Sequence, residues 1–571
     1  MYKQVFDPIG GSLGLSTLFA VLPLVVLFVL LGGFKVKAHW AALASLATAL
    51  VVAIAVYGVP APQALDSGAE GAVFGLFPIM WIVFNALWIY NMTVETGRFD
   101  VIRRSLGSIS EDARIQAVLI AFCFGTLLEG LAGFGTPVAI TAVMLIALGF
   151  KPVKAAALAL VADTVPVAFG AIAIPITTLG QTTGLPTDTL GAMVGRQTPF
   201  LALIVPFILI FMVDGRRGLR QTWPAGLLAG VSFGVTQFAT SNYISIELAD
   251  IIAALVSIGV LVALTRVWQP GEPLQAGVEG RSGAPAIAGA ATRDVDLEER
   301  LRERKGRERA ATLHEALGER RRRGDSAGEI LVAFAPYLII IAVFMIFQIG
   351  PIKTWLAGTV QEFAWPGLHI LTPDGTPPKS ATFSFNYLPA AGTVLLICGL
   401  LTMAVLRVRP GQAARIYLAT LNQMKWATLT VCSVLALAYV MNQSGQTSTL
   451  ALWLAGAGSI FAFLSGIIGW LGVAVTGSDT SSNALFGALQ VKAAQGAGLS
   501  PTLMAAANSS AGVIGKMISP QNLAIGAAAV GLAGREGELF RKVVGWSLVL
   551  LVAMCILVTL QSTAILSWMV P

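Results

Sequence analysis

Long apolar stretches recur along almost the whole chain and alternate with short polar connections. A helix needs about 20 apolar residues to cross the hydrocarbon core of a bilayer. By that length the pattern predicts about 12 transmembrane helices, near residues 15–34, 39–58, 72–92, 155–176, 191–213, 223–242, 247–266, 329–350, 386–406, 425–443, 501–525 and 543–567. We therefore expect an all-α polytopic membrane protein.

Two further apolar segments, 115–149 and 450–490, are interrupted by glycines and small polar residues. The interruptions lie around Glu129–Pro137 in the first segment and Thr476–Asn483 in the second. Non-helical backbone at membrane depth is tolerated where it is buried in protein or lines a watery cavity. We expect each segment to form a re-entrant helical hairpin.

A second interrupted segment follows each hairpin, and the two share one spacing. Asp163, Gly170 and Pro175 in the first half match Asn508, Gly515 and Pro520 in the second, at identical offsets of seven and twelve residues. Paired interruptions in corresponding positions of two hydrophobic halves indicate the binding site of a secondary transporter.

Loop charges orient the predicted spans. Lys and Arg gather in every second loop, whereas the loops 59–71 and 177–190 contain neither. Basic loops stay in the cytoplasm, which places both termini outside and makes the two hairpins enter from opposite sides. The predicted organisation is two inverted-topology repeats, with a first repeat at 1–213, a connecting helix pair at 214–267, a charged cytoplasmic linker at 268–328 and a second repeat at 329–571.

The composition agrees with a membrane protein. Of the 571 residues, 56% are hydrophobic and 12% are charged, where a soluble domain has about 25% charged residues. The net charge of +7 fits cytoplasmic loops rather than a nucleic-acid surface. The four cysteines all lie in apolar stretches, and their spacing predicts neither a disulfide framework nor a metal site. We expect no cofactor and no enzyme activity.

Four ionisable residues lie deep inside the predicted spans and hairpins, away from their ends: Glu129, Asp163, Asp479 and Lys516. Charges at membrane depth are costly and usually face the interior of the bundle. Lys516 is a candidate counter-charge for an anion, or else a structural partner of Asp479 or Glu129. No histidine lies deep in a span, so a coupled proton would be carried by Glu129 or Asp163. Asp479 is a third candidate, with helix capping as its alternative role.

The hairpin tips offer glycines, hydroxyls and helix N-termini, which suit a small organic anion. The predicted substrate-binding residues there are Gly133, Gly135, Thr136, Gly477, Ser478, Thr480 and Ser481. Asn483, Asn508 and Ser509 complete the candidate set together with Lys516. If Na⁺ is the coupling ion, these three residues and the carbonyls at the breaks are its candidate ligands.

At these same residues the chain resembles the L-lactate permease family. The resembling stretches are Leu128–Ile140, Pro166–Ala171, Gly477–Phe486 and Gly515–Gln521. The likeness extends over nearly the whole length, except for a longer and more charged linker at 268–328. Asp163 stands where many relatives are expected to have Asn.

The resemblance implies proton-coupled uptake of L-lactate, with D-lactate and glycolate as related substrates, across the bacterial cytoplasmic membrane. Its layout is similar to that of the wider ion transporter superfamily, in which a hairpin-bearing domain moves past a scaffold as an elevator. A homodimer is compatible with that layout.

Three other functions remain open. A Na⁺-coupled di- or tricarboxylate transporter should want more than one deep basic residue, and the predicted spans offer Lys516 alone. An intramembrane aspartyl protease would need Asp163 and Asp479 together, but they lie in opposed repeats and lack a Gly-x-Gly-Asp context. A passive channel would not accumulate its substrate.

Overall fold

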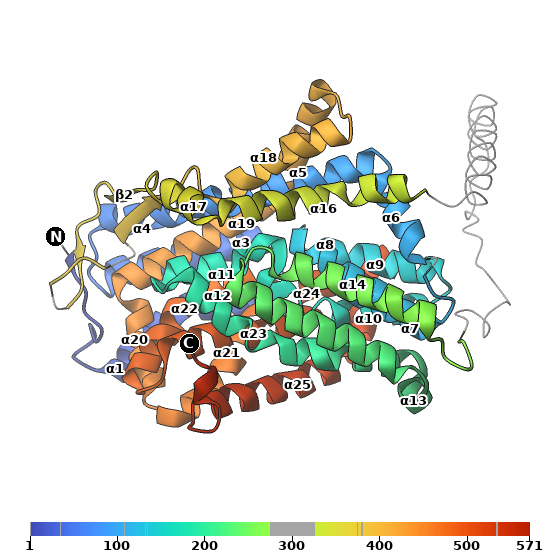
Figure 1. Cartoon of the computed structure of the whole chain (residues 1–571). Helices are drawn as coiled ribbons and strands as arrows, with labels where there is room; N and C mark the ends of the chain where they lie inside the picture. The colour runs from blue at the N-terminus through green and yellow to red at the C-terminus, as the bar shows by residue number, and fades with distance from the viewer. Residues whose placement is uncertain are drawn as a thin grey trace, which may run out of the picture.

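The computed structural model describes residues 2–34, 36–107, 109–131, 133, 135–274, 326–373, 375–378, 381–532 and 535–571. Within these ranges the protein is a bundle of helices with two short two-stranded sheets at one end (Figure 1). The prediction of an all-α polytopic membrane protein is confirmed. Most of the predicted linker 268–328 lies outside the described residues.

Ten helical stretches of the described residues are long and apolar enough to cross a bilayer, or eleven if one bent pair counts as a span. They are Leu13–Leu31, Ala38–Ala55, Ala61–Glu95, Ala113–Leu131, Thr187–Tyr243, Ala249–Val267, Ala327–Phe347, Pro410–Ser444, Gly458–Thr476 and Glu536–Gln561, and the bent pair joins Pro152–Ala162 to Val167–Thr183.

This set differs from the predicted 12 helices for physical reasons. The predicted spans 191–213 and 223–242 fall in one helical stretch, and helix α18 (Ala391–Val405) is too short to be counted. The first arms of the two predicted hairpins, in contrast, are long enough to qualify as spans. Hydropathy alone does not distinguish a long hairpin arm from a full crossing.

Local signals in the sequence set where the interrupted helices begin. Ser500 and Ser519 cap α23 (Pro501–Gly515) and α24 (Pro520–Ala529), and each serine is followed by a proline. A serine cap satisfies a free backbone N–H, and proline suits the first helical position because its missing N–H is not needed there. These pairs fix two helix starts beside the interruptions.

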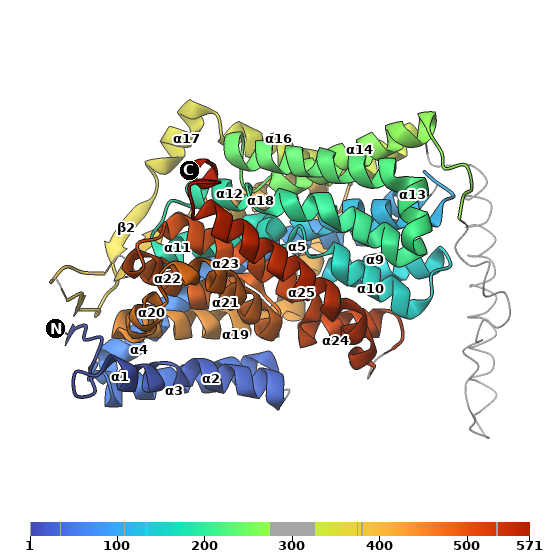
Figure 2. The same ribbon diagram turned by 90° about the horizontal axis from the view of Figure 1, so that it is seen from below.

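The two halves of the chain are packed into each other. Helix α11 (Gly170–Thr183) of the first half packs against α22 (Asp479–Gly496) of the second, and α24 packs against α9 (Thr136–Ala147) (Figure 2). Each hairpin thus contacts the interrupted helix pair of the other half. This reciprocal packing is what two opposed repeats would produce, although the repeat itself stays a prediction.

A second group of helices packs around α19 (Pro410–Ser444), which contacts α3 (Ala38–Ala55), α4 (Ala61–Phe74) and α5 (Trp81–Glu95). The contact with α4 is close, because a Cβ at Gly71 would lie 2.5 Å from the backbone oxygen of Leu435. Because glycine has no Cβ, the two backbones can approach this closely.

A buried ion pair holds the start of the first hairpin. Arg114 is fully buried, and its guanidinium donates to Asp112 at 2.6 Å and to Asp214 at 3.0 Å. Burial raises the pKa of the Asp112 carboxyl, but hydrogen bonds from Arg114 and from the Leu274 N–H outweigh it and leave that pKa below its usual value. The pair connects the hairpin to the non-helical residues at Asp214 and Gly215 inside α13 (Thr198–Tyr243).

The short strands lie near the N-terminus. Strand β1 (Tyr2–Lys3) pairs in parallel with β3 (Ile370–Leu371), and β2 (Gln361–Ala364) pairs antiparallel with β4 (Thr382–Phe385). Tyr2 of β1 also donates a hydrogen bond from its hydroxyl to the Ser444 carbonyl at the end of α19.

Candidate functional site

Four interruptions of helices line one small cavity. Two are the turns inside the predicted hairpins, between α8 (Gly125–Leu131) and α9 and between α21 (Phe461–Thr476) and α22. The third lies between α10 (Pro152–Ala162) and α11, where the chain bends by 65°. The fourth is the short helix η7 (Lys516–Ile518) between α23 and α24.

The cavity has a volume of about 50 Å³. Its lining residues are Glu129, Gly133, Val167, Gly170, Ala171, Ile174, Pro175, Gly477, Ser478, Asp479, Thr480, Lys516 and Gln521. Five predicted substrate-binding residues are in this lining, namely Gly133, Gly477, Ser478, Thr480 and Lys516. The other six, Gly135, Thr136, Ser481, Asn483, Asn508 and Ser509, lie outside it.

The hairpin turns depend on glycine. Gly133, Gly135 and Gly477 have φ of +55°, +76° and +75°, in the left-handed region that side chains with a Cβ avoid. At Gly477 a Cβ would also lie 2.7 Å from the Oε1 atom of Gln521, which lines the same cavity. The glycines therefore shape the turns and leave room between them.

Lys516 joins two carboxylates from separate elements. Its ammonium donates to Glu129 Oε1 at 2.7 Å and lies 3.0 Å from Asp163 Oδ2. Glu129 lies on α8 and Asp163 ends α10, whereas Lys516 begins η7 in the other half of the chain. All three side chains are at most 6% exposed. The sequence suggested Asp479 or Glu129 as a structural partner of Lys516. The structure pairs the lysine with Glu129 and Asp163, and no ion pair with Asp479 occurs among the described residues.

Gly170 makes room for this ion cluster. A Cβ at Gly170 would lie 2.8 Å from Glu129 Oε1, the same oxygen that accepts from Lys516. Any side chain there would push Glu129 away from the lysine.

Asp479 has neutral partners instead. Its Oδ2 accepts a hydrogen bond from Ser509 Oγ at 2.5 Å and from Asn483 Nδ2 at 3.3 Å. Asn483 also donates to the carbonyl of Pro175 and accepts from Asn508 Nδ2 at 2.9 Å. Asn483, Asn508 and Ser509 are fully buried. They lie behind the cavity and hold α22 against α11 and α23.

Several carboxylate oxygens at the site keep unused acceptor capacity. Within the described residues, Glu129 Oε2, Asp163 Oδ1 and Asp479 Oδ1 are buried without a hydrogen-bond partner. Buried polar atoms normally have partners, so each of these oxygens is a candidate position for a proton, water or ligand. The site thus contains three carboxyl groups and one ammonium group.

The N-terminus of α22 borders the cavity. Ser478 is its cap and accepts a hydrogen bond from the Ser481 N–H at 3.3 Å, so the capping role considered for Asp479 belongs to Ser478. Asp479 is the first helical residue. The free N–H groups and dipole of a helix N-terminus favour negative charge, which suits this end to an anion.

The start of α11 has an unusual backbone. Ala171, Ile172 and Ala173 have φ of +45°, +59° and +56°, although none is glycine. A left-handed conformation costs L-residues roughly 1–2 kcal/mol each. Such outliers cluster at ligand sites, and Ala171 lines the cavity. No signal in the sequence predicts this turn.

Sequence reasoning missed three buried polar residues. Glu70 was assigned to the loop 59–71, but the helical stretch Ala61–Glu95 begins earlier than the predicted span 72–92. Glu70 lies on α4 and accepts a hydrogen bond from Gln443 Nε2 at 2.7 Å. Asp250, at the start of α14 (Ala249–Val267), accepts from Gln237 Nε2 at 2.8 Å. Gln490 donates to Asn508 Oδ1 at 3.1 Å. Its spacing from Asp479 and Asn483, at 479, 483 and 490, places it on one helix face and was a usable signal.

Comparison with known proteins identifies relatives along the full chain. The model of the L-lactate permease family matches residues 16–565. A glycolate permease of Escherichia coli is 42% identical over 98% of both chains, and an L-lactate permease of Bacillus subtilis is 42% identical over 100% of both. A solved structure of Neisseria gonorrhoeae MtrF, described as illuminating a class of antimetabolite efflux pumps, is 14% identical, with a TM-score of 0.43 over 88% of this chain and 83% of that chain.

Proposed function

The chain belongs to the L-lactate permease family, and from that premise we propose that it carries lactate and glycolate into the cell together with protons. It is a multi-pass membrane transporter and not an enzyme. Its relatives are named permeases for L-lactate and glycolate, so 2-hydroxy monocarboxylates are the proposed substrates, D-lactate included. The relatives are bacterial, and the proposed location is the bacterial cytoplasmic membrane.

The observation that carries the proposal is the contact of Lys516 with Glu129 and Asp163 at the cavity. Lys516 is the cation best placed to bind a substrate carboxylate, but its ammonium already pairs with the carboxylates of Glu129 and Asp163. If Glu129, Asp163 and Asp479 were all ionised, the site would have a charge of −2 before any anion entered. Uncompensated charge at membrane depth is costly, so an anion should enter only when protons neutralise carboxylates.

The need to neutralise these carboxylates would couple anion entry to protons. Protonation of Asp163 or Glu129 releases the lysine, which then binds the substrate carboxylate. Anion binding should therefore tighten as pH falls. Asp479 is the third candidate proton carrier, since its Oδ1 is buried beside the cavity without a partner among the described residues.

The size of the cavity supports a small substrate. A cavity needs about 10–15 Å³ to hold one water molecule, so about 50 Å³ accommodates a few non-hydrogen atoms. Gly133, Gly477, Ser478 and Thr480 would surround the substrate, with Gly135, Thr136 and Ser481 supporting the turns. Asn483, Asn508 and Ser509 would act as positioning residues. A tricarboxylate would need a larger opening and more positive charge.

For the movement, we propose an elevator in which the two hairpins and interrupted helices shift past the helices packed around α19. The close reciprocal packing of the two halves supports movement as one body. A homodimer would hold the helices packed around α19 in place while the other helices move.

Purified transporter in proteoliposomes tests the coupling. An inward proton gradient without sodium should drive accumulation of labelled lactate, and glycolate should compete better than succinate. Strict dependence on sodium, with Asn483, Asn508 and Ser509 as ligand candidates, would instead favour the Na⁺-coupled carboxylate transporter. Equilibration without accumulation would indicate a channel.

A further inference from the structure

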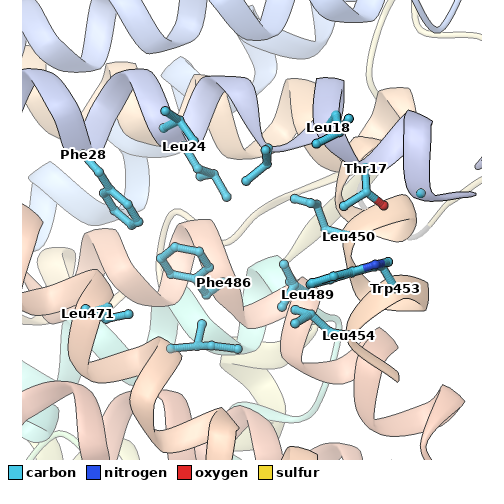
Figure 3. A pocket seen from close by; sticks show the side chains of 14 residues that line it. Thr17, Leu18, Leu24, Phe28, Leu450, Trp453, Leu454, Leu471, Phe486 and Leu489 are labelled. Carbon is cyan, nitrogen blue, oxygen red and sulfur yellow. The ribbon is translucent and has the colours of Figure 1, made fainter. Parts of the chain in front are cut away.

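A large apolar groove lies apart from the proposed anion cavity, between the N-terminal helices and the second hairpin. Its volume is about 530 Å³. One wall is α1 (Leu13–Ala20) and α2 (Leu22–Phe28), and the other is formed by α20 (Gln446–Ala455), α21 and α22 (Figure 3). The anion cavity and the groove share α22, which carries Asp479 near one and Phe486 in the other.

The lining of the groove offers almost nothing to a polar ligand. The side chains are aliphatic or aromatic except for Thr17, whose hydroxyl already donates to the Leu13 carbonyl at 2.8 Å. The indole N–H of Trp453 is the other polar group, and Figure 3 shows this residue near Thr17 and Leu18, at the end away from Phe28. Apolar cavities do not retain water, since a buried water needs several polar partners.

The groove has a buried floor and an exposed rim. Leu24 and Phe486 are 5% exposed, whereas Leu18 and Trp453 on the rim are 61% and 56% exposed. At the far end the rings of Phe28 and Phe486 lie 6.2 Å apart. Because Leu13–Leu31 is long and apolar enough to cross the membrane, we expect the open side of the groove to face lipid rather than water.

We propose that the groove binds one acyl chain of a membrane phospholipid. The chain would lie along α2 with its headgroup end near Trp453, since tryptophan favours the interface between hydrocarbon and headgroups. Its methylenes would fill a space that water cannot fill and that a close-packed interior would not leave empty. The lipid would brace α22, the helix that also positions Asp479 and Asn483. This site does not depend on which ion drives transport.

Native mass spectrometry after a fixed detergent wash tests the site. Val25 lies on the rim and is 43% exposed, so Val25→Trp fills the groove without overpacking its floor. Val552→Trp is the matched control, because Val552 is 49% exposed on α25 (Glu536–Gln561), outside the groove lining. Wild type and Val552→Trp should retain one phospholipid per chain, and Val25→Trp should retain at least fivefold less.

Equal lipid retention in all three proteins, or none in wild type, overturns the proposal. Dissociation of a dimer by Val25→Trp also overturns the proposal, since a second copy of the chain would then be the occupant of the groove. If Val25→Trp fails to fold, a phospholipid with a photoreactive diazirine in its acyl chain gives an independent answer on wild type. Adducts should concentrate on α2 and around Phe486, and adducts spread evenly over the outer surface would contradict the site.

Discussion

The buried carboxyl groups beside the cavity form two clusters, and each cluster is stabilised in a different way. Glu129 and Asp163 share the ammonium of Lys516, whereas Asp479 is held by the neutral donors of Ser509 and Asn483. The carboxyl groups of the two clusters lie at helix interruptions in the first and in the second half of the chain, and Lys516 comes from the second half. The difference teaches that helix interruptions in two halves of one chain can hold buried carboxyl groups by different electrostatic means. One half brings carboxylates to a cation, and the other buries a carboxyl group among hydroxyls and amides.

The most damaging change to the charged cluster should be Lys516→Gln. It leaves Glu129 and Asp163 without their cation, and removing one partner of a buried ion pair costs about 3–5 kcal/mol. At about 1.4 kcal/mol per factor of ten, lactate uptake in proteoliposomes should fall at least 100-fold. Lys492→Gln is the matched control, because Lys492 lies on α22 and contacts Ser448 rather than a carboxylate. Similar losses in both variants would remove the special role of Lys516.

The next largest effect should come from Asp163→Asn, which fixes this position in a neutral state. With one proton per lactate, a gradient of one pH unit supports about tenfold accumulation, because 1.36 kcal/mol corresponds to a factor of ten. We expect the variant to lose that accumulation and yet exchange labelled for unlabelled lactate. Unchanged proton-driven accumulation in Asp163→Asn would exclude Asp163 as the carrier and leave Glu129 or Asp479.

The neutral cluster should respond more mildly. Ser509→Ala removes the 2.5 Å hydrogen bond to Asp479, and the loss of a hydrogen bond costs about 1 kcal/mol, or more if the acceptor is charged. Binding of lactate to purified protein should weaken about fivefold. The neighbouring Ser510 donates to Gln197 instead, so Ser510→Ala is the control. A loss as large as that of Lys516→Gln would mean that the two clusters are electrostatically alike.

The smallest expected effect is that of Ser478→Ala. Losing an N-cap costs about 1 kcal/mol of helix stability, and here only the first turn of α22 is concerned. We expect the KM for lactate to rise about two- to threefold. Ser500→Ala removes the equivalent cap from α23, away from the cavity, and should leave the KM unchanged. A matching rise in KM for both variants would show that stability alone, and not the end of α22 at the cavity, is responsible.

The sequence allowed the membrane fold, the interrupted segments and four charged residues beside the cavity to be predicted. These depend on local composition, because apolar length, glycine and isolated deep charge are visible one segment at a time. The pairing of Lys516 with Asp163 was not predictable, since the two residues are 353 positions apart and meet through packing. Glu70 escaped notice because an acidic residue near the end of a span resembles a loop residue, and the left-handed turn at 171–173 has no glycine to mark it.

The reciprocal packing of the halves bears on what a shorter protein of this kind could do. The cavity takes Glu129 and Gly170 from one half and Ser478 and Lys516 from the other. A protein with a single hairpin and a single interrupted helix pair would contain only half of the residues of such a binding site. A second molecule lying antiparallel beside it would have to contribute the other half of the lining. Such a protein would therefore bind its ligand only as a dimer.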